Sequence, residues 1–190
     1  CVVKIIGGQI GTQQGYATGL IVSPDGEIVT ALASLLEASD LRVVTSDGRL
    51  HRAQVVHRDP YRQLALLKTG SGVFPEAAPR DPPSPMPPPR AVHIDEALQP
   101  AIGDGVFVIG NPFKIADGDE PCSVTHGILS GRIRLDARRP GQGAAVAFHG
   151  NVWIMDAMSS NPGSPGSAVF DLQGRWIGLI GEVVESRLTN

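Results

Sequence analysis

The run of residues 117–120 (Asp-Gly-Asp-Glu) places carboxylates close to Cys122 and His126, a combination of side chains that can bind a metal ion. Carboxylates suit hard cations, whereas a thiolate and an imidazole suit softer ones, so the set matches no single metal well. The run also lacks the length and the closing glutamate of an EF-hand loop. A metal-binding module is one hypothesis, and an exposed acidic loop is the simpler interpretation. The sequence as a whole predicts no bound metal and no other cofactor.

A second group of chemically capable side chains consists of arginines, at Arg132, Arg134, Arg138 and Arg139. Because residues two apart on a strand share a face, Arg132 and Arg134 would project together, and the later Arg-Arg-Pro-Gly is typical of a loop. Guanidinium groups bind carboxylates through paired hydrogen bonds, so a surface for an acidic partner is one interpretation. A solvated rim explains the same arginines without a partner.

Composition excludes several classes of protein. The chain has 190 residues, 42% of them hydrophobic and 18% charged, which is typical of one compact unit or two very small ones. Its formal net charge of −3 argues against general nucleic-acid binding, which needs a surplus of cations facing phosphate. No apolar run approaches the roughly 18 residues of a membrane span. Cys1 and Cys122 fit either one disulfide or two free thiols.

Turn residues divide the chain into short segments. The 23 glycines and 16 prolines, with Val, Ile and Leu spread between them, are typical of many short strands joined by turns. Ser-Pro-Asp-Gly at 23–26 predicts a hairpin, and residues 31–36 are expected to form one helical turn. His51 and His57 lie six apart on a predicted strand and are therefore expected on one face of it.

Prolines mark the boundary between two strand-rich halves. Residues 75–90 contain eight of the 16 prolines and predict an extended connector, with a docking site for a proline-binding domain as a less simple alternative. The sequence thus predicts an all-β protein made of an N-terminal β-barrel (1–74), a proline-rich inter-barrel connector (75–98) and a C-terminal β-barrel (99–190). The two barrels are expected to be antiparallel and packed together.

Five segments resemble the protease domain of HtrA-type serine proteases, and they occur in the order of that family. They are residues 18–30, 58–68, 103–113, 123–130 and 156–178. The resemblance implies a trypsin-like double antiparallel β-barrel and a serine endopeptidase. It also implies a bacterial periplasmic, secreted or membrane-anchored location outside the cytoplasm, neighbouring domains in the parent protein, and a second barrel that is truncated here. The proline-rich connector departs from the family.

The same resemblance assigns the three positions of a catalytic triad, and all three hold a different residue here. The Thr-x-x-His pattern that carries the general base corresponds to Thr30 through Ala33. The orienting aspartate precedes Leu-Ala-Leu-Leu-Lys, where this chain has Gln63. The nucleophilic serine of the pattern Asn-Pro-Gly-Asn-Ser-Gly-Gly corresponds to Pro165.

These replacements remove the groups that serine proteolysis needs. Ala33 cannot accept a proton, and Gln63 cannot stabilise an imidazolium ion. Pro165 has no hydroxyl, and it also lacks the backbone N–H that serves as one oxyanion donor in this fold. One such donor is worth about 10²–10³ in rate.

A displaced constellation is the remaining route to catalysis. Ser164 and Ser167 flank the proline and could supply a nucleophile. His126 is the best of the five histidines as its base, because its strand borders the nucleophile loop in related proteases. An ordinary strand histidine is the simpler interpretation of His126.

Three hypotheses follow for the function. The first is a catalytically inactive trypsin-fold pseudoprotease that acts as a binding or scaffold module for a protein or peptide, with extended peptides held in a cleft near Asn161, Gly163, Ser164 and Asp156. The second is an active HtrA-like serine endopeptidase with a displaced Ser/His pair. The third is the metal-binding module.

Overall fold

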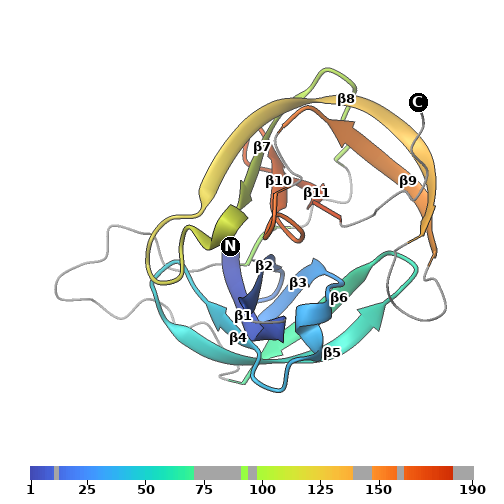
Figure 1. The fold of residues 1–190 in the computed structure, drawn as a ribbon. Helices are drawn as coiled ribbons and strands as arrows, with labels where there is room; N and C mark the ends of the chain where they lie inside the picture. Colours follow the sequence, from blue (N-terminus) through green and yellow to red (C-terminus); the bar gives the residue numbers. More distant parts are fainter. Residues whose placement is uncertain (11–12, 71–90, 94–97, 139–146, 158–160, 182–190) are drawn as a thin grey trace.

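The computed structural model describes residues 1–10, 13–70, 91–93, 98–138, 147–157 and 161–181 (Figure 1). Most of the expected connector, residues 75–98, lies outside them. The elements are β1 (Val2–Ile10), β2 (Gln13–Ile21), β3 (Glu27–Ala31), η1 (Ser34–Glu37), β4 (Arg42–Val44), β5 (Leu50–Asp59), β6 (Leu64–Thr69), β7 (Gly105–Gly110), η2 (Pro112–Lys114), β8 (Ser123–Arg138), β9 (Ala147–Met155), β10 (Ala168–Asp171) and β11 (Trp176–Leu179). In this described part of the chain, no helix has the length and apolar character needed to cross a membrane.

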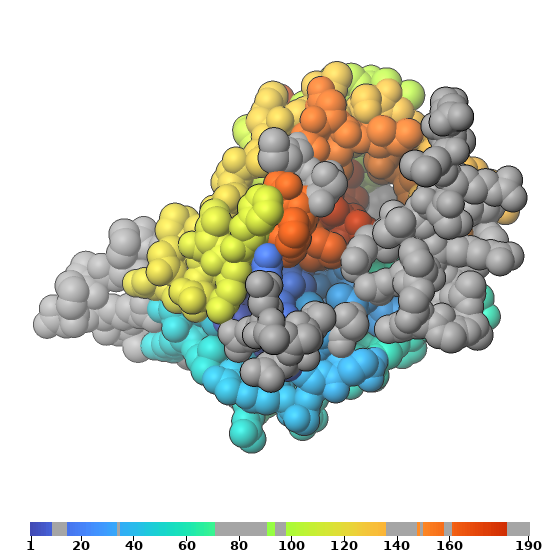
Figure 2. Space-filling model, in the orientation of Figure 1, coloured from blue at the N-terminus to red at the C-terminus, as the bar shows by residue number. Residues whose placement is uncertain are grey.

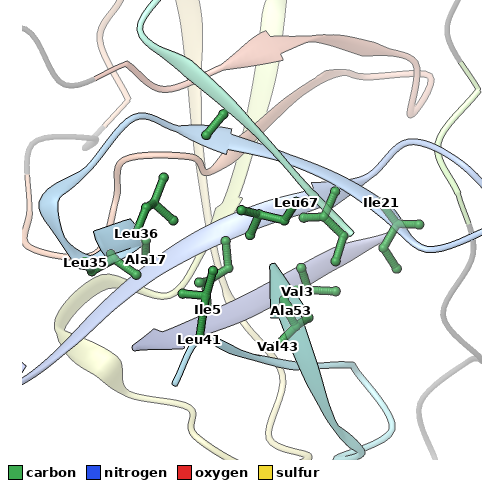
Figure 3. Packing of buried hydrophobic residues seen from close by; sticks show 12 residues of the cluster. Val3, Ile5, Ala17, Ile21, Leu35, Leu36, Leu41, Val43, Ala53 and Leu67 are labelled. Atoms are coloured by element: carbon green, nitrogen blue, oxygen red, sulfur yellow. The ribbon is translucent and has the colours of Figure 1, made fainter. Parts of the chain in front are cut away.

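Strands β1 to β6 close into a barrel in the order β1-β2-β3-β6-β5-β4, and neighbouring strands are antiparallel. Alternate burial turns one face of a strand toward the interior, as in β6, where Ala65, Leu67 and Thr69 are buried and the residues between them are half-buried. Aliphatic side chains from several strands fill the interior (Figure 3). This packing agrees with a sequence that has only 5% aromatic residues.

Strands β7 to β11 form a five-stranded antiparallel sheet in the order β11-β10-β7-β8-β9. Its longest hairpin joins β8 to β9, with paired residues running from Leu129 and Met155 to Arg138 and Ala147. A bulge after Leu129 interrupts this ladder, and bulges bend the strand that carries them. The sheet curls around a second core, which includes Val106 and Val169 (Figure 1).

The closed barrel and the curled sheet pack directly against each other, with the cool colours of the first half against the warm colours of the second in Figure 2. A third apolar cluster lies at this contact, where Leu20 of β2 is buried with Ala168 and Phe170 of β10. The two halves therefore share buried apolar surface as well as being covalently linked.

The arrangement confirms the predicted all-β class. The helical turn expected within residues 31–36 is the 3₁₀ helix η1, which begins at Ser34. The prediction that His51 and His57 share a face is wrong, because a bulge between Val55 and His57 inverts the alternation of β5. His51 faces the same side as the buried Ala53, whereas His57 is exposed.

Candidate active site

Residues 161–167 form a compact loop that leads into β10. The N–H of Ser164 donates to the carbonyl of Asn161 (3.0 Å), and the N–H of Ser167 donates to the carbonyl of Ser164 (2.9 Å). The N–H of Gly166 donates to the carbonyl of Ile180 (2.9 Å), which fixes the loop to the end of the following hairpin. The loop thus has a defined shape that its own backbone maintains.

Thr18 of β2 fastens this loop to the first barrel. Its Oγ1 donates to the carbonyl of Gly163 (3.0 Å) and accepts the N–H of Asn111 (3.0 Å), and its N–H donates to the carbonyl of Pro165 (3.3 Å). The hydroxyl of Thr30 in turn donates to the carbonyl of Thr18 (2.6 Å). The sequence does not identify Thr18 as a site residue, because a single hydroxyl beside an apolar run is common in strands and indicates no particular role.

Two glycines let the loop approach the first barrel this closely. Gly163 (φ +86°) and Gly166 (φ +84°) adopt the left-handed conformation that other residues avoid. An added Cβ at Gly166 would lie 1.9 Å from the carbonyl oxygen of Thr18, and one at Gly163 would lie 2.4 Å from the ring of Tyr16. Packing between the halves therefore requires glycine at both positions.

Pro165 lies between these glycines and is half-buried. Its ring offers neither a hydroxyl nor an N–H. The flanking serines are buried, Ser164 being 4% and Ser167 1% exposed. The hydroxyl of Ser167 lies against β7, since a Cβ built on Gly110 would be 1.9 Å from it. The hydroxyl of Ser167 is therefore packed against a strand and not presented to solvent.

Ala33 and Gln63 lie on neighbouring segments of the first half. The N–H of Leu32 donates to the carbonyl of Gln63 (2.8 Å), which brings Ala33 beside the beginning of β6. Gln63 has a left-handed backbone (φ +56°), is 4% exposed, and donates from Nε2 to the carbonyl of Pro60 (2.5 Å). Its Oε1 is buried and has no hydrogen-bond partner within the described residues. An unpaired buried oxygen of this kind costs about 1–3 kcal/mol.

His126 is on the opposite face of the second sheet from Ser167. It pairs with Phe107 in the β7–β8 register, and the two rings lie 5.2 Å apart at 53°. Gly110, which contacts Ser167, is three residues beyond Phe107 on β7, and an odd spacing on a strand reverses the face. The structure therefore does not bring this histidine and this serine together, and His126 is exposed.

Asp156, which was predicted to line a cleft, holds backbone in place. Its Oδ1 accepts the N–H of Ile128 (2.7 Å), and its own N–H donates to the carbonyl of Ile128 (3.3 Å). These two bonds connect the end of β9 to β8 next to the bulge. Asn161, Gly163 and Ser164 likewise hold backbone in place, through the hydrogen bonds of the loop 161–167 given above.

Two backbone carbonyls of the acidic run 117–120 bind a lysine of the chain itself. Lys4 of β1 is 1% exposed, and its Nζ donates to the carbonyls of Gly118 (2.5 Å) and Glu120 (2.7 Å). The pKa of Glu120 is lowered by hydrogen bonds from its own N–H and from that of Gly118. Across the part of the chain that the structure describes, no group of three or more His, Cys, Asp or Glu side chains could hold a metal ion.

Both cysteines are free thiols, so the structure has the second of the two arrangements that the sequence left open. Burial raises the pKa of the Cys122 thiol, and the charge of Lys4 offsets this only in part. A thiol with a raised pKa is protonated at neutral pH and is a poor nucleophile.

Known proteins resemble this chain along most of its length. The model of the trypsin-like peptidase domain family matches residues 17–179. Protease Do-like 1, chloroplastic, of Arabidopsis thaliana is 30% identical over 166 residues, which are 87% of this chain and 33% of that protein. A probable periplasmic serine endoprotease DegP-like of Ectopseudomonas mendocina is 28% identical over 93% of this chain and 31% of its own length. The protein of the same name from Chlamydia trachomatis is also 28% identical, over 85% of this chain and 27% of its own length.

The match runs from β2 to β11 and so covers most of the closed barrel and the curled sheet, and the double β-barrel arrangement implied by the sequence motifs is confirmed. The chain spans about a third of the length of the relatives that it matches. It belongs to the trypsin-like peptidase domain family, as an HtrA-type member.

Proposed function

We propose that this chain is a catalytically silent trypsin-fold domain that acts as a binding or scaffold module for a protein or peptide partner. The observation that carries the proposal is Pro165 at the centre of a loop that Thr18 and two glycines hold in a defined shape. Proline at this point leaves the loop without an attacking hydroxyl and without one backbone donor for an oxyanion.

The two helper positions support the same proposal. Ala33 ends at a methyl group and cannot take a proton from a nucleophile. Gln63 is neutral, and its Nε2 is already bound to the carbonyl of Pro60. Restoring a serine at position 165 alone would therefore supply a hydroxyl with no base to activate it.

The alternatives have less support from the geometry. A displaced Ser/His pair would need His126 on the face of the sheet that carries Ser167, and the register puts it on the other. A metal-binding module would need several ligating side chains close together, and the described residues hold no group of three or more His, Cys, Asp or Glu side chains that could bind a metal ion.

A fluorophosphonate probe tests catalytic silence directly, because it reacts covalently with activated serines. We expect the folded chain to be labelled no more than the heat-unfolded chain, with an active serine protease as the positive control. The variants Ser164→Ala and Ser167→Ala identify any reactive residue. Labelling of the folded chain that disappears in either variant would refute the proposal.

We further propose that the parent protein works outside the cytoplasm and carries additional domains. The support is that two of the similar proteins are named periplasmic, and that this chain covers about a third of each relative. Fractionation of the source cells with an antibody against this chain should place it in the extracytoplasmic fraction, and recovery with the cytosolic proteins would contradict the location.

A further inference from the structure

The two free cysteines of the chain come from opposite halves of the molecule. Cys1 precedes β1 of the closed barrel, and Cys122 precedes β8 of the curled sheet. Both side chains are half-buried, so each is largely covered by protein but is not sealed from small reagents. A bond between them would therefore connect the first half directly to the second.

Lys4 holds the segment that leads to Cys122 against the strand that follows Cys1. The lysine is 1% exposed, and its Nζ donates to the carbonyls of Gly118 (2.5 Å) and Glu120 (2.7 Å). These carbonyls replace the water that the ammonium group loses on burial, so breaking the connection is costly. Cys1 lies three residues before Lys4, and Cys122 lies two residues after Glu120. The same connection therefore brings both cysteines into one region of the contact.

Further contacts place the two residues close together. Cys1 packs on the apolar cluster between the halves, and Ile109 of β7 packs on the same cluster. Ile109 and Gly110 pair with the first residues of β8, which Cys122 immediately precedes. The Cys122 thiol is within electrostatic reach of the backbone nitrogen of Cys1 and of the Lys4 ammonium group. In Figure 1 the N-terminus accordingly lies next to η2 and the segment that leads into β8.

Both cysteines lie just outside the regular strand ladders. The ladders of β1 and β8 begin at Val2 and Ser123, one residue after each cysteine. A disulfide bond needs its two Cα atoms about 4.4–6.8 Å apart. Residues at these positions can adjust their backbone toward that separation without breaking a strand pair.

We propose that Cys1 and Cys122 are a redox pair, which a small disulfide such as oxidised glutathione converts from the two free thiols of this structure into one bond between the halves. One protein thiolate attacks the oxidant and releases one glutathione thiolate, and the second protein thiolate then displaces the other. Each released thiolate takes up one of the two protons that the protein thiols give up. Disulfides persist outside the cytoplasm, where the parent protein is proposed to work. The inference goes beyond the binding function and does not depend on it.

Cys122 is expected to be the second of the two thiols to react. Burial raises the pKa of its thiol, so little thiolate is present at neutral pH. Once Cys1 carries a glutathione group, Cys122 attacks a sulfur of its own molecule, and the high effective concentration compensates for its low reactivity. Cys122→Ser should therefore accumulate the mixed disulfide at Cys1 faster than Cys1→Ser accumulates one at Cys122.

Mass spectrometry of the full chain tests the bond itself. The chain is incubated at low concentration with mixtures of reduced and oxidised glutathione, quenched with acid and weighed intact. We expect a product lighter than the reduced chain by two hydrogen atoms, and digestion should link the peptide of Cys1 to that of Cys122. Dithiothreitol should reverse the change. A folded chain that gains glutathione groups or stays unchanged, without losing these hydrogens, would overturn the inference.

Thermal unfolding tests what the bond does to the molecule. The oxidised chain should melt about 5–15 °C above the reduced chain, because the bond closes a loop of most of the first half and part of the second in the unfolded state. Cys1→Ser and Cys122→Ser should each melt at one temperature with and without oxidant. Measuring both variants under reducing conditions separates the loss of the bond from any general loss of stability. An oxidised chain that melts no higher than the reduced one would contradict a bond built into the native fold.

A matched variant tests whether the arrangement is specific. Combining Cys122→Ser with Ser123→Cys moves the thiol by one residue, to the other face of β8. This variant should form the intramolecular bond at least about tenfold more slowly than the unchanged chain. Equal rates would show that the position of Cys122 has no special relation to Cys1. Disulfide-linked dimers in place of the intramolecular product would make a second copy the partner and would also refute the pair, and none of these results bears on fluorophosphonate labelling.

Discussion

The buried hydroxyl of Thr18 bonds the first half of this molecule to the second. Thr18 comes from the second strand, yet its Oγ1 bonds to backbone groups of Gly163 and Asn111, which belong to separate loops of the second half. A buried hydrogen bond between neutral groups adds only modestly to the free energy of unfolding, but an unpaired buried partner lowers it by the whole desolvation free energy of that group. The loop around Pro165 therefore depends on a side chain that is remote in sequence.

Replacing this hydroxyl by a methyl group should be costly. Thr18→Val keeps the shape of the side chain but leaves the N–H of Asn111 and the carbonyl of Gly163 buried and unpaired. We expect a loss of about 2–4 kcal/mol in the free energy of unfolding, measured by urea denaturation. Thr18→Ser keeps the hydroxyl and should lose only about 1 kcal/mol for the missing methyl group. Equal losses in the two variants would show that the hydrogen bonds contribute little.

Replacing Gln63, whose Oε1 is unpaired in the described part of the chain, should stabilise the fold and not destabilise it. Gln63→Leu removes a buried acceptor without a donor, and it frees the exposed residue Pro60 to bond with water instead. The free energy of unfolding should therefore rise by about 1 kcal/mol. Differential scanning calorimetry shows whether the variant is more or less stable, from the direction in which its melting temperature changes. A lower melting temperature than that of the unchanged chain would mean that Oε1 has a partner in solution.

At the scale of elements, the loop 161–167 owes its shape to a close approach of two backbones. Gly166 combines a left-handed φ with direct contact to Thr18, whereas Gly174 in the β10–β11 turn has a similar φ (+78°) and open space around it. The two positions therefore separate the conformational effect of a side chain from its steric effect.

An alanine at each glycine measures this difference. Gly174→Ala should lose about 1–2 kcal/mol, which is the cost of a left-handed conformation alone. Gly166→Ala adds a collision with the carbonyl of Thr18 and should lose more than about 3 kcal/mol or fail to fold. Urea unfolding of both variants gives the comparison. Similar losses would mean that the loop can move away from β2 at little cost.

Asp171 closes the β10–β11 hairpin and makes its stability depend on pH. Its carboxylate accepts the N–H of Gln173 (3.0 Å) and both the N–H (2.8 Å) and the Nε (2.6 Å) of Arg175. Burial raises the pKa of Asp171, but these bonds outweigh it and hold the pKa below its usual range. The carboxylate therefore stabilises the fold above its ordinary pKa of about 3.9, and the effect is lost as pH falls through the lower folded value.

Asp171→Asn tests this pH dependence. The variant should be less stable than the unchanged chain at pH about 6, and the difference should shrink as the pH falls below about 4. Urea unfolding followed by circular dichroism across this range measures both chains. A difference that stays constant down to pH about 2 would mean that ionisation of this carboxyl is not involved.

Sequence patterns located most strands, because alternate burial is a local property that short apolar runs record. The run Leu64–Thr69 is an example, and its burial alternates as the pattern predicts. The same reasoning failed at His57, where a bulge in β5 inverted the face, since a bulge depends on the partner strand. Lys4 could not be linked to the acidic run from the sequence, because 114 residues separate it from Gly118.

At the scale of the whole molecule, the two halves share a buried apolar contact in addition to the hydrogen bonds of Thr18 and Lys4, and they should unfold together. Leu20 is fully buried beside Ala168 and Phe170 of the other half. The two tryptophans, Trp153 and Trp176, both lie in the second half, and both tyrosines lie in the first. Tryptophan fluorescence therefore reports on one half, and tyrosine absorbance reports mainly on the other.

Leu20→Ala should lower the stability reported by both probes by about the same amount, roughly 2–5 kcal/mol, because the cavity lies at the shared contact. Val124→Ala, at a residue 60% exposed, serves as the control and should change little. Denaturation curves from the two probes should coincide in every case. Separate transitions, with only the tyrosine curve shifted by Leu20→Ala, would show that the halves are independent.

The dependence of the 161–167 loop on Thr18 bears on how related sequences are interpreted. The loop that most readily identifies the family is also a contact between the two halves, because Thr18 of the first half bonds to it and Gly166 packs against Thr18. Mutation can replace a nucleophile at position 165 while Gly163 and Gly166 are retained, because these glycines are needed for the packing of the loop on the first half. A match to this stretch in another sequence is therefore evidence of the loop's shape, whereas evidence of peptide-bond cleavage has to come from the residues at the positions of Pro165, Ala33 and Gln63.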